Sequence, residues 1–468
     1  EFRRVLFRSQ AEGWQLNPYE ENSKTHELEE TGKVASTGFY ANTVNQKFTF
    51  DATDKLSFYA RGGYYDNKTR RPYEAYDYNI LHETFNYGIG AQYMINKGNY
   101  ITADCYADHF SSSYCFFKDN KTYNGKAGEE QVRKRTRNHN LSIKGIFKLG
   151  NRHKLSVGTE YIVDVLKSQT DNIAKEDAYT LALFAQDEIK LLRNLQALIG
   201  VRYIYHENFK NHATPNVALM YKPGKFNFRA SYAAGFRTPT LSELYATDIA
   251  KKNDRLTIGN LDLKPEKNNY FSLSAEYVHE RFSVSVNAFY NNIRDMIDYN
   301  TIATGDKAME QYGHKEVRQR DNIAEAKVHG INVSANAYLG AGFNLSGGYT
   351  HLNTQDVELE QPIDKSIKNA YNINAQWAHS WKIYRLNINL NGRFNSKRFS
   401  KSYGYAPEYQ LWDLNTRHSF NLKSVIIEPG CGMENLFDYM DDRPYNSNYA
   451  TLTPGRSFYI SLSLKFKS

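Results

Sequence analysis

Regular alternation of apolar and polar residues is the feature that most constrains how this chain of 468 residues can fold. In the segment Phe458–Phe466, every second residue is Phe, Ile or Leu, and the residues between them are Tyr, Ser and Lys. Similar alternation occurs in Phe282–Ala288 and in Leu195–Tyr205. Because successive side chains of a β-strand point to opposite faces, each segment predicts a strand with one apolar and one polar face.

The length of these segments separates a membrane barrel from a soluble β-sandwich. Sandwich strands have about five or six residues, whereas strands that cross a bilayer have about nine to eleven. From Thr37 onward, long alternating segments are joined in turn by short connections, such as Lys222–Gly224, and by long polar ones, such as Lys118–Arg135 and Asn300–Arg320. This arrangement predicts an all-β, transmembrane antiparallel barrel of about nineteen recognisable strands, although such barrels close with an even number.

The composition agrees with a membrane barrel. The chain contains 37 Tyr, 26 Phe and 4 Trp, although its mean hydropathy is −0.68. Aromatic residues suit the two membrane interfaces, and polar residues suit the lumen. No apolar run approaches the about 18 residues of a spanning helix. The net charge of +8 favours anionic ligands.

Enzymatic and metal-binding motifs are absent from the sequence. No glycine-rich phosphate loop, HExxH, GxSxG or paired catalytic carboxylates occur, so the chain is predicted not to be an enzyme and to need no cofactor. Cys105, Cys115 and Cys431 have no zinc-site spacing, and a Cys105–Cys115 disulfide remains an alternative to three free thiols. His206 and His212 fall in an expected outer loop, where surface residues are a simpler interpretation than metal ligands. The basic stretch around Arg135 lacks interleaved aromatic residues, so nucleic acid is not an expected partner.

Two motifs follow one another in the middle of the chain. Ala234–Tyr245 (AGFRTPTLSELY) resembles the box of TonB-dependent outer-membrane receptors in which Gly-Phe-Arg ends a strand, Pro follows, and Glu-Leu-Tyr closes. Gly259–Glu266 (GNLDLKPE) is similar to the next box of that family, although Leu261 stands where the family has Pro. Pro cannot donate to a strand ladder, and Arg offers a forked cation near the strand end.

Further segments resemble the distal barrel of the same family in the same order. These are Phe184–Glu188, Phe271–Tyr277, Val286–Ile297, Asn322–Ala335, Gly347–Thr350, Asn435–Asp438 and Pro454–Arg456, followed by the terminal strand. The motif positions are expected to be structural or functional, with ligand contacts unassigned. They are Gly235, Phe236, Arg237, Pro239, Glu243, Leu244, Tyr245, Asn260, Lys264, Pro265, Glu266, Asn435, Leu436, Phe437, Asp438, Gly455, Arg456 and Phe466.

The resemblance implies most of a 22-stranded barrel in the bacterial outer membrane, surrounded by its lipid. It also implies a lumenal plug and a coupling segment that engages the TonB–ExbB–ExbD system. Neither is present, so residues 11–468 are interpreted as a partial barrel whose plug and first strands are missing, and residues 1–10 as an assembly scar. The barrel-assembly machinery is expected to recognise the terminal strand through Phe466, which Lys467 and Ser468 follow.

The resemblance also implies import of a scarce small-molecule chelate. Haem receptors of the family place a His between the two boxes, and none lies between Phe236 and Leu263. An anionic ferric siderophore is therefore the first expectation, because basic loops with Tyr and Arg suit carboxylate and catecholate groups. Cobalamin or another metal chelate is the alternative within the family. A passive porin or adhesin barrel, or an outer-membrane enzyme, would be the alternative from another class.

Overall fold

A computed structural model of the chain describes residues 2–15, 19–22, 25–250, 254–401, 404–441 and 453–466. Across these residues, one large sheet contains 22 strands. Two of them, β14 (Thr247–Ala250) and β15 (Arg255–Ile258), form a short hairpin in a loop, which leaves 20 strands in the wall. An even number agrees with the architecture of bacterial outer-membrane barrels.

The wall strands pair antiparallel in the order of the chain. They are β1 (Phe2–Trp14), β4 (Ser36–Thr53), β5 (Leu56–Arg70), β6 (Tyr78–Asn96), β7 (Asn99–Phe116), β8 (Glu130–Leu149), β9 (His153–Ser168), β10 (Ile173–Leu192), β11 (Leu195–His206), β12 (Lys210–Tyr221), β13 (Phe226–Arg237), β16 (Glu266–Val278), β17 (Phe282–Thr304), β18 (Glu316–Gly340), β19 (Phe343–Asp356), β20 (Asn369–Trp381), β21 (Tyr384–Asn395), β24 (Tyr409–Asn421), β25 (Val425–Glu434) and β26 (Ser457–Phe466). The predicted antiparallel barrel wall is thereby confirmed. From the sequence, strands were predicted only from Thr37 onward, but β1 precedes that position.

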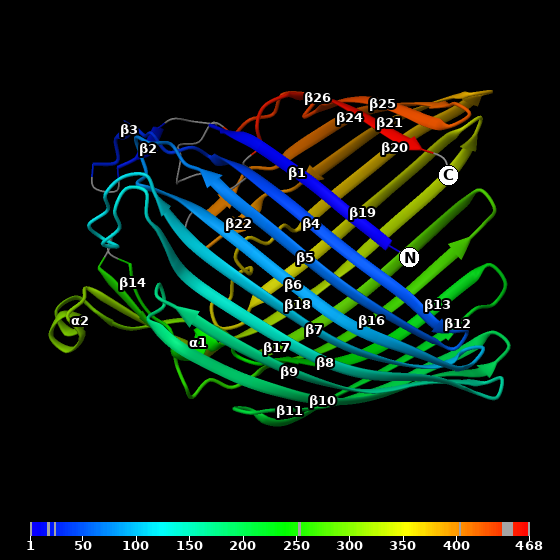
Figure 1. Cartoon of the computed structure of the whole chain (residues 1–468), viewed down its shortest axis with the longest axis horizontal. Coiled ribbons are helices and arrows are strands. Elements are labelled where there is room, and N and C mark those ends of the chain that lie inside the picture. Colours follow the sequence, from blue (N-terminus) through cyan, green and yellow to red (C-terminus); the bar gives the residue numbers. More distant parts are fainter. Residues whose placement is uncertain are drawn as a thin grey trace.

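The expected contrast between short and long connections is confirmed, and the two kinds lie at opposite ends of the wall (Figure 1). Lys222–Gly224 is one of the short turns, between β12 and β13. The long connections carry the minor elements at the other end. These are β2 (Tyr19–Glu21), β3 (Leu28–Glu30), α1 (Leu241–Tyr245), the β14–β15 hairpin, α2 (Gly305–Tyr312), β22 (Arg398–Ser400) and β23 (Gly404–Ala406).

Both long connections named from the sequence were predicted to be longer than they are. Residues 118–135 were expected to form a loop, but β8 begins at Glu130. Residues 300–320 were expected to form a loop, but β17 continues to Thr304 and β18 begins at Glu316, which gives the two strands lengths of 23 and 25 residues and leaves α2 between them. The extended part of β18 then pairs in parallel with β15, with Arg255 opposite Glu316. The projecting strands pack Ala303 and Val317 against α2 and the β14–β15 hairpin in a small apolar core, so they lack the regular apolar alternation that marks the membrane-crossing part of a strand.

Alternation separates an apolar outer face from a polar inner face. On β26, Ile460 and Leu462 are 88% and 67% exposed, as expected for side chains that face lipid. On the same face of the wall, aromatic side chains gather near the short-turn end, where the rings of Trp381 and Tyr384 stack 5.6 Å apart. A second row, formed by Tyr161, Tyr179 and Tyr205, lies nearer the long-loop end, with ring centroids 5.9 and 6.0 Å apart. Two aromatic rows are typical of the two interfaces of a membrane barrel.

Two further observations bear on the sequence-based expectations. No helix among the described residues is long and apolar enough to cross a membrane. All three cysteines are free thiols, and Cys105 and Cys115 lie on the same strand, β7, so the alternative of a disulfide between them is wrong.

Candidate functional site

The two central motifs meet at the long-loop end of β13, in a cluster built around Arg237. Arg237 pairs in register with Glu266, the first residue of β16. Its guanidinium donates to both carboxylate oxygens of Glu266, from Nε at 2.8 Å and from Nη2 at 2.7 Å. It also donates to Glu243, from Nη1 at 2.9 Å and from Nη2 at 3.2 Å. One arginine therefore clamps two carboxylates from different parts of the chain.

Glu243 is held in this position by the start of α1. The Thr240 hydroxyl accepts a hydrogen bond from the Glu243 backbone N–H at 3.2 Å, and Glu243 Oε2 accepts one from the Thr240 N–H at 2.8 Å. This reciprocal capping box follows Pro239, which is buried immediately after β13 ends. Burial would raise the pKa of the Glu243 carboxyl, but hydrogen bonds from Arg237 and Thr240 outweigh it and hold the pKa below its ordinary value.

The rest of the second motif anchors the same loop to the projecting strands. Asn322, on β18, accepts from the Lys264 N–H at 2.7 Å and donates to the Lys264 carbonyl at 2.9 Å. Asn260 donates to the Arg320 carbonyl at 3.0 Å. Pro265 is buried, and Leu244 packs with Leu263, Ile297, Phe209 and Tyr245 in a small apolar core. Gly235 and Phe236 lie on β13, where the Phe236 ring stacks on His212 at 4.7 Å.

The C-terminal motifs form a second cluster, between β25 and β26. Asn435 is 3% exposed and accepts from the Tyr439 N–H at 2.9 Å while donating to the Tyr439 carbonyl at 2.7 Å. Asp438 accepts from the Arg456 N–H at 2.6 Å, and Arg456 Nε donates to the Leu436 carbonyl at 3.1 Å. A Cβ at Gly455 would lie 2.8 Å from Asp438 Oδ1, so a larger residue there would displace the Asp438 carboxylate.

The remaining C-terminal positions point away from this network. Phe437 is 64% exposed and meets the edge of Trp412 with ring centroids 6.3 Å apart. Phe466 ends β26 opposite Val425 and is 81% exposed on the outer face. Lys467 and Ser468 lie outside the described residues. Within each of the two clusters, most motif positions contact one another, and these contacts stabilise the connections between strands.

A third group, here called the mouth cluster, combines arginine and tyrosine at the long-loop end of β6, β7 and β8. Its members are Arg71, Tyr76, Tyr78, Tyr114, Tyr123 and Arg133. The rings of Tyr78 and Tyr114 stack at 4.1 Å, and Tyr123 meets Tyr114 edge-on at 5.2 Å. Tyr78 and Tyr114 lie on the strand face opposite to lipid-exposed Phe85 and Ile101, so they point to the lumen side.

Both arginines of the mouth cluster lie over tyrosine rings. The Arg71 guanidinium is 4.8 Å from the Tyr76 centroid and 5.1 Å from that of Tyr78. Arg133 is 5.4 Å from Tyr114 and 5.0 Å from Tyr123, and its Nη1 donates to Gln169 at 3.0 Å. Burial raises the pKa of Tyr123 above its ordinary value. In the described part of the chain, the Arg71 side chain has no hydrogen-bond or ion-pair partner.

The loop of residues 117–129 closes over the mouth cluster from one side. Gly125 approaches the Phe116 ring so closely that a Cβ would lie 2.5 Å from it. Phe116 is 3% exposed beneath this turn, and its ring lies 5.5 Å from that of Tyr78. The tyrosines are therefore held in place by packing against this loop.

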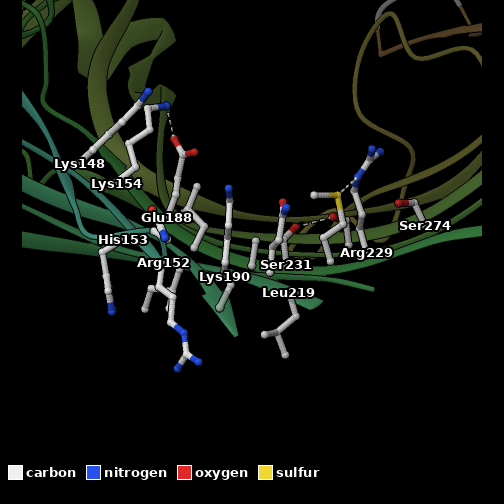
Figure 2. A pocket seen from close by; sticks show the side chains of 18 of the residues that line it. Lys148, Arg152, His153, Lys154, Glu188, Lys190, Leu219, Arg229, Ser231 and Ser274 are labelled. Atoms are coloured by element: carbon white, nitrogen blue, oxygen red, sulfur yellow. Dashed lines mark hydrogen bonds and ion pairs between the residues drawn. The ribbon is translucent and has the colours of Figure 1, made fainter. Parts of the chain in front are cut away.

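A fourth group, here called the exit cluster, consists of Lys148, Lys154, Lys190 and Arg229. These cations line a cavity of about 890 Å³ at the short-turn end of the inner wall. Figure 2 shows Lys148, Lys154, Lys190 and Arg229 pointing to one side of the sheet, and Arg152, His153 and Leu219 to the other. Leu219 is 46% exposed on the lipid face, so the four cations face the lumen. Of these four cations, only Lys154 has an acidic partner among the described residues, Glu188 at 2.9 Å. The inner wall is therefore positive at this end.

The histidines singled out from the sequence have other partners. His206 ends β11, is 8% exposed, and accepts from the Asn208 N–H at 3.1 Å. His212 lies on β12 and donates from Nε2 to the Phe209 carbonyl at 3.0 Å. Within the described ranges, no group of three His, Cys, Asp or Glu residues is placed to hold a metal ion. The mouth and exit clusters were missed from the sequence, because only strand register brings their members together.

The barrel wall of this chain is similar to those of known proteins. The family model described as "TonB dependent receptor-like, beta-barrel" matches residues 14–435. Among solved structures, a variant of the ferric enterobactin receptor PfeA from Pseudomonas aeruginosa has a TM-score of 0.79 and 15% identity, covering 99% of this chain and 76% of that one.

Two other solved structures have the same fold with different printed ligands. The siderophore receptor PirA from Acinetobacter baumannii has a TM-score of 0.76 and 15% identity, covering 100% of this chain and 75% of that one. The copper transporter OprC has a TM-score of 0.72 and 10% identity, covering 98% of this chain and 75% of that one. At these identities, the likeness supports the barrel fold and leaves the ligand open.

Proposed function

This chain belongs to the TonB-dependent receptor β-barrel family of the bacterial outer membrane, and we propose that the ligand it imports is an anionic ferric siderophore. The family consists of transport receptors, and the enzyme alternative has no support in the residues described above. Energy would come from the TonB–ExbB–ExbD system in the inner membrane. The lumenal plug and coupling segment that this route requires remain predictions, which the genomic sequence upstream of residue 1 would test.

The mouth cluster is the observation that carries this proposal. Arg71 and Arg133 present cations held over the rings of Tyr76, Tyr78, Tyr114 and Tyr123. A ferric catecholate combines flat aromatic rings with a net negative charge, so both halves of the cluster suit it. Arginine N–H donors can bind its oxygens, and tyrosine rings can stack against its rings.

Two further observations support an anionic chelate. The exit cluster keeps the inner wall positive at the opposite end of the lumen, so an anion meets favourable charge at both ends. Two of the similar solved structures are receptors for siderophores by their printed names. Cobalamin, which lacks a strong negative charge, would gain less from these arginines.

Uptake by cells tests the proposal directly. Bacteria that lack their own siderophore receptors and carry the complete gene should accumulate iron-55 from a ferric catecholate. Dissipating the proton gradient should abolish this accumulation, because transport depends on the inner-membrane system. Accumulation that survives dissipation would favour a passive porin, and accumulation of cyanocobalamin alone would favour the alternative ligand.

Substitutions in the mouth cluster separate capture from folding. Arg71→Ala with Arg133→Ala should weaken ferric catecholate binding to whole cells by about tenfold or more, as expected for the loss of charge-assisted hydrogen bonds. Lys121→Ala is the control, because Lys121 is an exposed cation in the loop of residues 117–129 and lies outside the cluster. Equal affinity in the double variant and the control would contradict the assignment of the mouth cluster.

A further inference from the structure

The outer face of β8 changes from basic to apolar along its length. From residue 135 to residue 143, exposed positions alternate strictly with less exposed ones. The exposed side chains, in order, are Arg135, Arg137, His139, Leu141 and Ile143. Leu141 and Ile143 are 48% and 45% exposed, as are other apolar side chains of the lipid-facing surface. The two arginines therefore point outward from the barrel on the same face as the membrane-contacting residues.

Neighbouring strands add further basic groups to this face. Lys167 of β9 lies directly opposite Arg135, and His109 of β7 lies opposite Arg137. The rings of His109 and His139 have centroids 5.5 Å apart. Directly opposite residues on antiparallel strands have Cβ atoms about 5 Å apart, so one phosphate group can reach several of these side chains at once. We call Arg135, Arg137, Lys167, His109 and His139 the outer basic patch.

The carboxylates around the outer basic patch have other partners. Glu83 of β6 accepts from the Tyr64 hydroxyl at 2.8 Å and from the Ser111 hydroxyl at 3.4 Å. Asp177 of β10 pairs with Lys175 at 3.2 Å. Among the described residues, no carboxylate forms an ion pair with Arg135, Arg137 or Lys167. The patch thus presents uncompensated positive charge.

The height of the patch on the barrel points to what covers it. Tyr161 lies opposite Leu141, and the row of Tyr161, Tyr179 and Tyr205 marks the outer membrane interface. Arg135 and Arg137 lie beyond this row, at the level of lipid headgroups, while Leu141 lies level with the row and Ile143 lies on its other side, toward the acyl chains. A ligand with a phosphate above and hydrocarbon below fits both halves of β8.

We propose that the outer basic patch binds the phosphate of an anionic, phosphorylated lipid of the outer leaflet, with its acyl chains against Leu141 and Ile143. Arginine guanidinium groups bind phosphate oxygens in a bidentate manner, and juxtamembrane cations are attracted to anionic lipids. The site lies on the outer face of the barrel. It rests on the membrane location of the chain and is independent of the imported ligand.

Binding of defined lipids to the purified chain in detergent tests this site by native mass spectrometry. The probes are bisphosphorylated lipid A, monophosphorylated lipid A, phosphatidylethanolamine and inorganic phosphate. Bisphosphorylated lipid A should bind about tenfold more tightly than phosphatidylethanolamine, with the monophosphorylated form between them. Millimolar inorganic phosphate should not displace it. Displacement by inorganic phosphate, or equal binding of all the lipids, would overturn the proposal.

Paired variants of β8 separate the patch from the general charge of the protein. Arg135→Ala with Arg137→Ala should weaken lipid A binding about tenfold or more. Lys144→Ala with Lys148→Ala removes two cations from the inner face of the same strand and should leave binding within about twofold. Equal losses in the two variants would contradict the proposal.

A folding check keeps the comparison decisive. The heat-dependent shift of a folded barrel on an electrophoresis gel reports whether each variant is folded. If the alanine variant does not fold, Arg135→Gln with Arg137→Gln replaces it, because Gln keeps the length and polarity of the side chain without the charge. Wild-type affinity in a folded, uncharged variant would overturn the site.

Discussion

At the scale of single residues, the family motifs act through charge and hydrogen bonding at the ends of strands. Arg237 joins Glu243 to Glu266, and Glu243 also caps α1. The side chain of Glu243 is 15% exposed and that of Arg237 is 43% exposed, so solvent screens the pair in part. Glu243 therefore contributes both an ion pair and a helix cap, and either one alone is modest in water.

We predict that Glu243→Gln loosens the connection between β13 and β16 without unfolding the wall. Gln can still accept the capping hydrogen bond, but the pairing with the Arg237 charge is lost, at a cost of about 1 kcal/mol. Hydrogen exchange of α1 should increase several-fold, while that of β13 stays unchanged. Glu358→Gln is the control, because Glu358 is an exposed loop acid with no ion pair among the described residues. Unchanged exchange in α1 would contradict the prediction.

The Glu243 carboxylate should also make the stability of the connection between β13 and β16 depend on pH. Burial would raise the pKa of Glu243, but the hydrogen bonds from Arg237 and Thr240 lower it overall. Because the pKa of Glu243 is lowered in the folded state, its stabilisation of the connection is fully present above about pH 4.3, the ordinary pKa of Glu. This stabilisation is lost as the pH falls through the lowered pKa. Exchange of α1, corrected for its intrinsic pH dependence, should therefore increase only in acid. Glu243→Gln should remove this acid-induced increase.

At the scale of strands and loops, sequence periodicity predicted most of the wall. Alternation revealed strands such as β11 and β26, because the bilayer demands an apolar outer face on each of them. The projecting parts of β17 and β18 were missed because they contact α2 and β15 rather than lipid, so no regular apolar alternation marks them. The mouth cluster was missed for another reason. Arg71 and Arg133 are far apart in sequence, and only the register of β6, β7 and β8, with its shift at Ser112 and Ser113, brings them together.

The two faces of β26 should lose different amounts of stability on substitution by arginine. Leu462 is 67% exposed on the lipid face near the middle of the strand, and Leu462→Arg should cost about 2–4 kcal/mol of stability in a bilayer. Ser463 faces the lumen opposite Glu428, so Ser463→Arg should cost about 1 kcal/mol or less. Unfolding in lipid vesicles by a denaturant measures both. Equal costs would contradict the assignment of the faces.

At the scale of the whole molecule, positive charge occurs on three surfaces with different roles. The mouth cluster faces the external ligand, the outer basic patch faces lipid, and the exit cluster faces the lumen at the far end. The net charge of +8 was visible in the sequence, but its division among these surfaces depends on strand register. In the proposed route, a ligand reaches the exit cluster only after it has bound at the mouth cluster, so we expect charge at the exit to affect the rate of passage more than capture.

We therefore predict that Lys190→Ala with Arg229→Ala slows uptake without weakening capture. The two substitutions remove half of the cations of the exit cluster, so an anionic chelate loses electrostatic attraction along its route, and its uptake rate should fall about threefold to tenfold. Surface binding at 4 °C should equal that of the wild type, and high salt should narrow the difference in uptake rate by screening the cluster. Arg152→Ala is the control, because Arg152 is a cation of the same cavity that points to the opposite side of the sheet. A similar fall in the control, or a fall in surface binding, would show that lumenal charge at the exit does not set the rate.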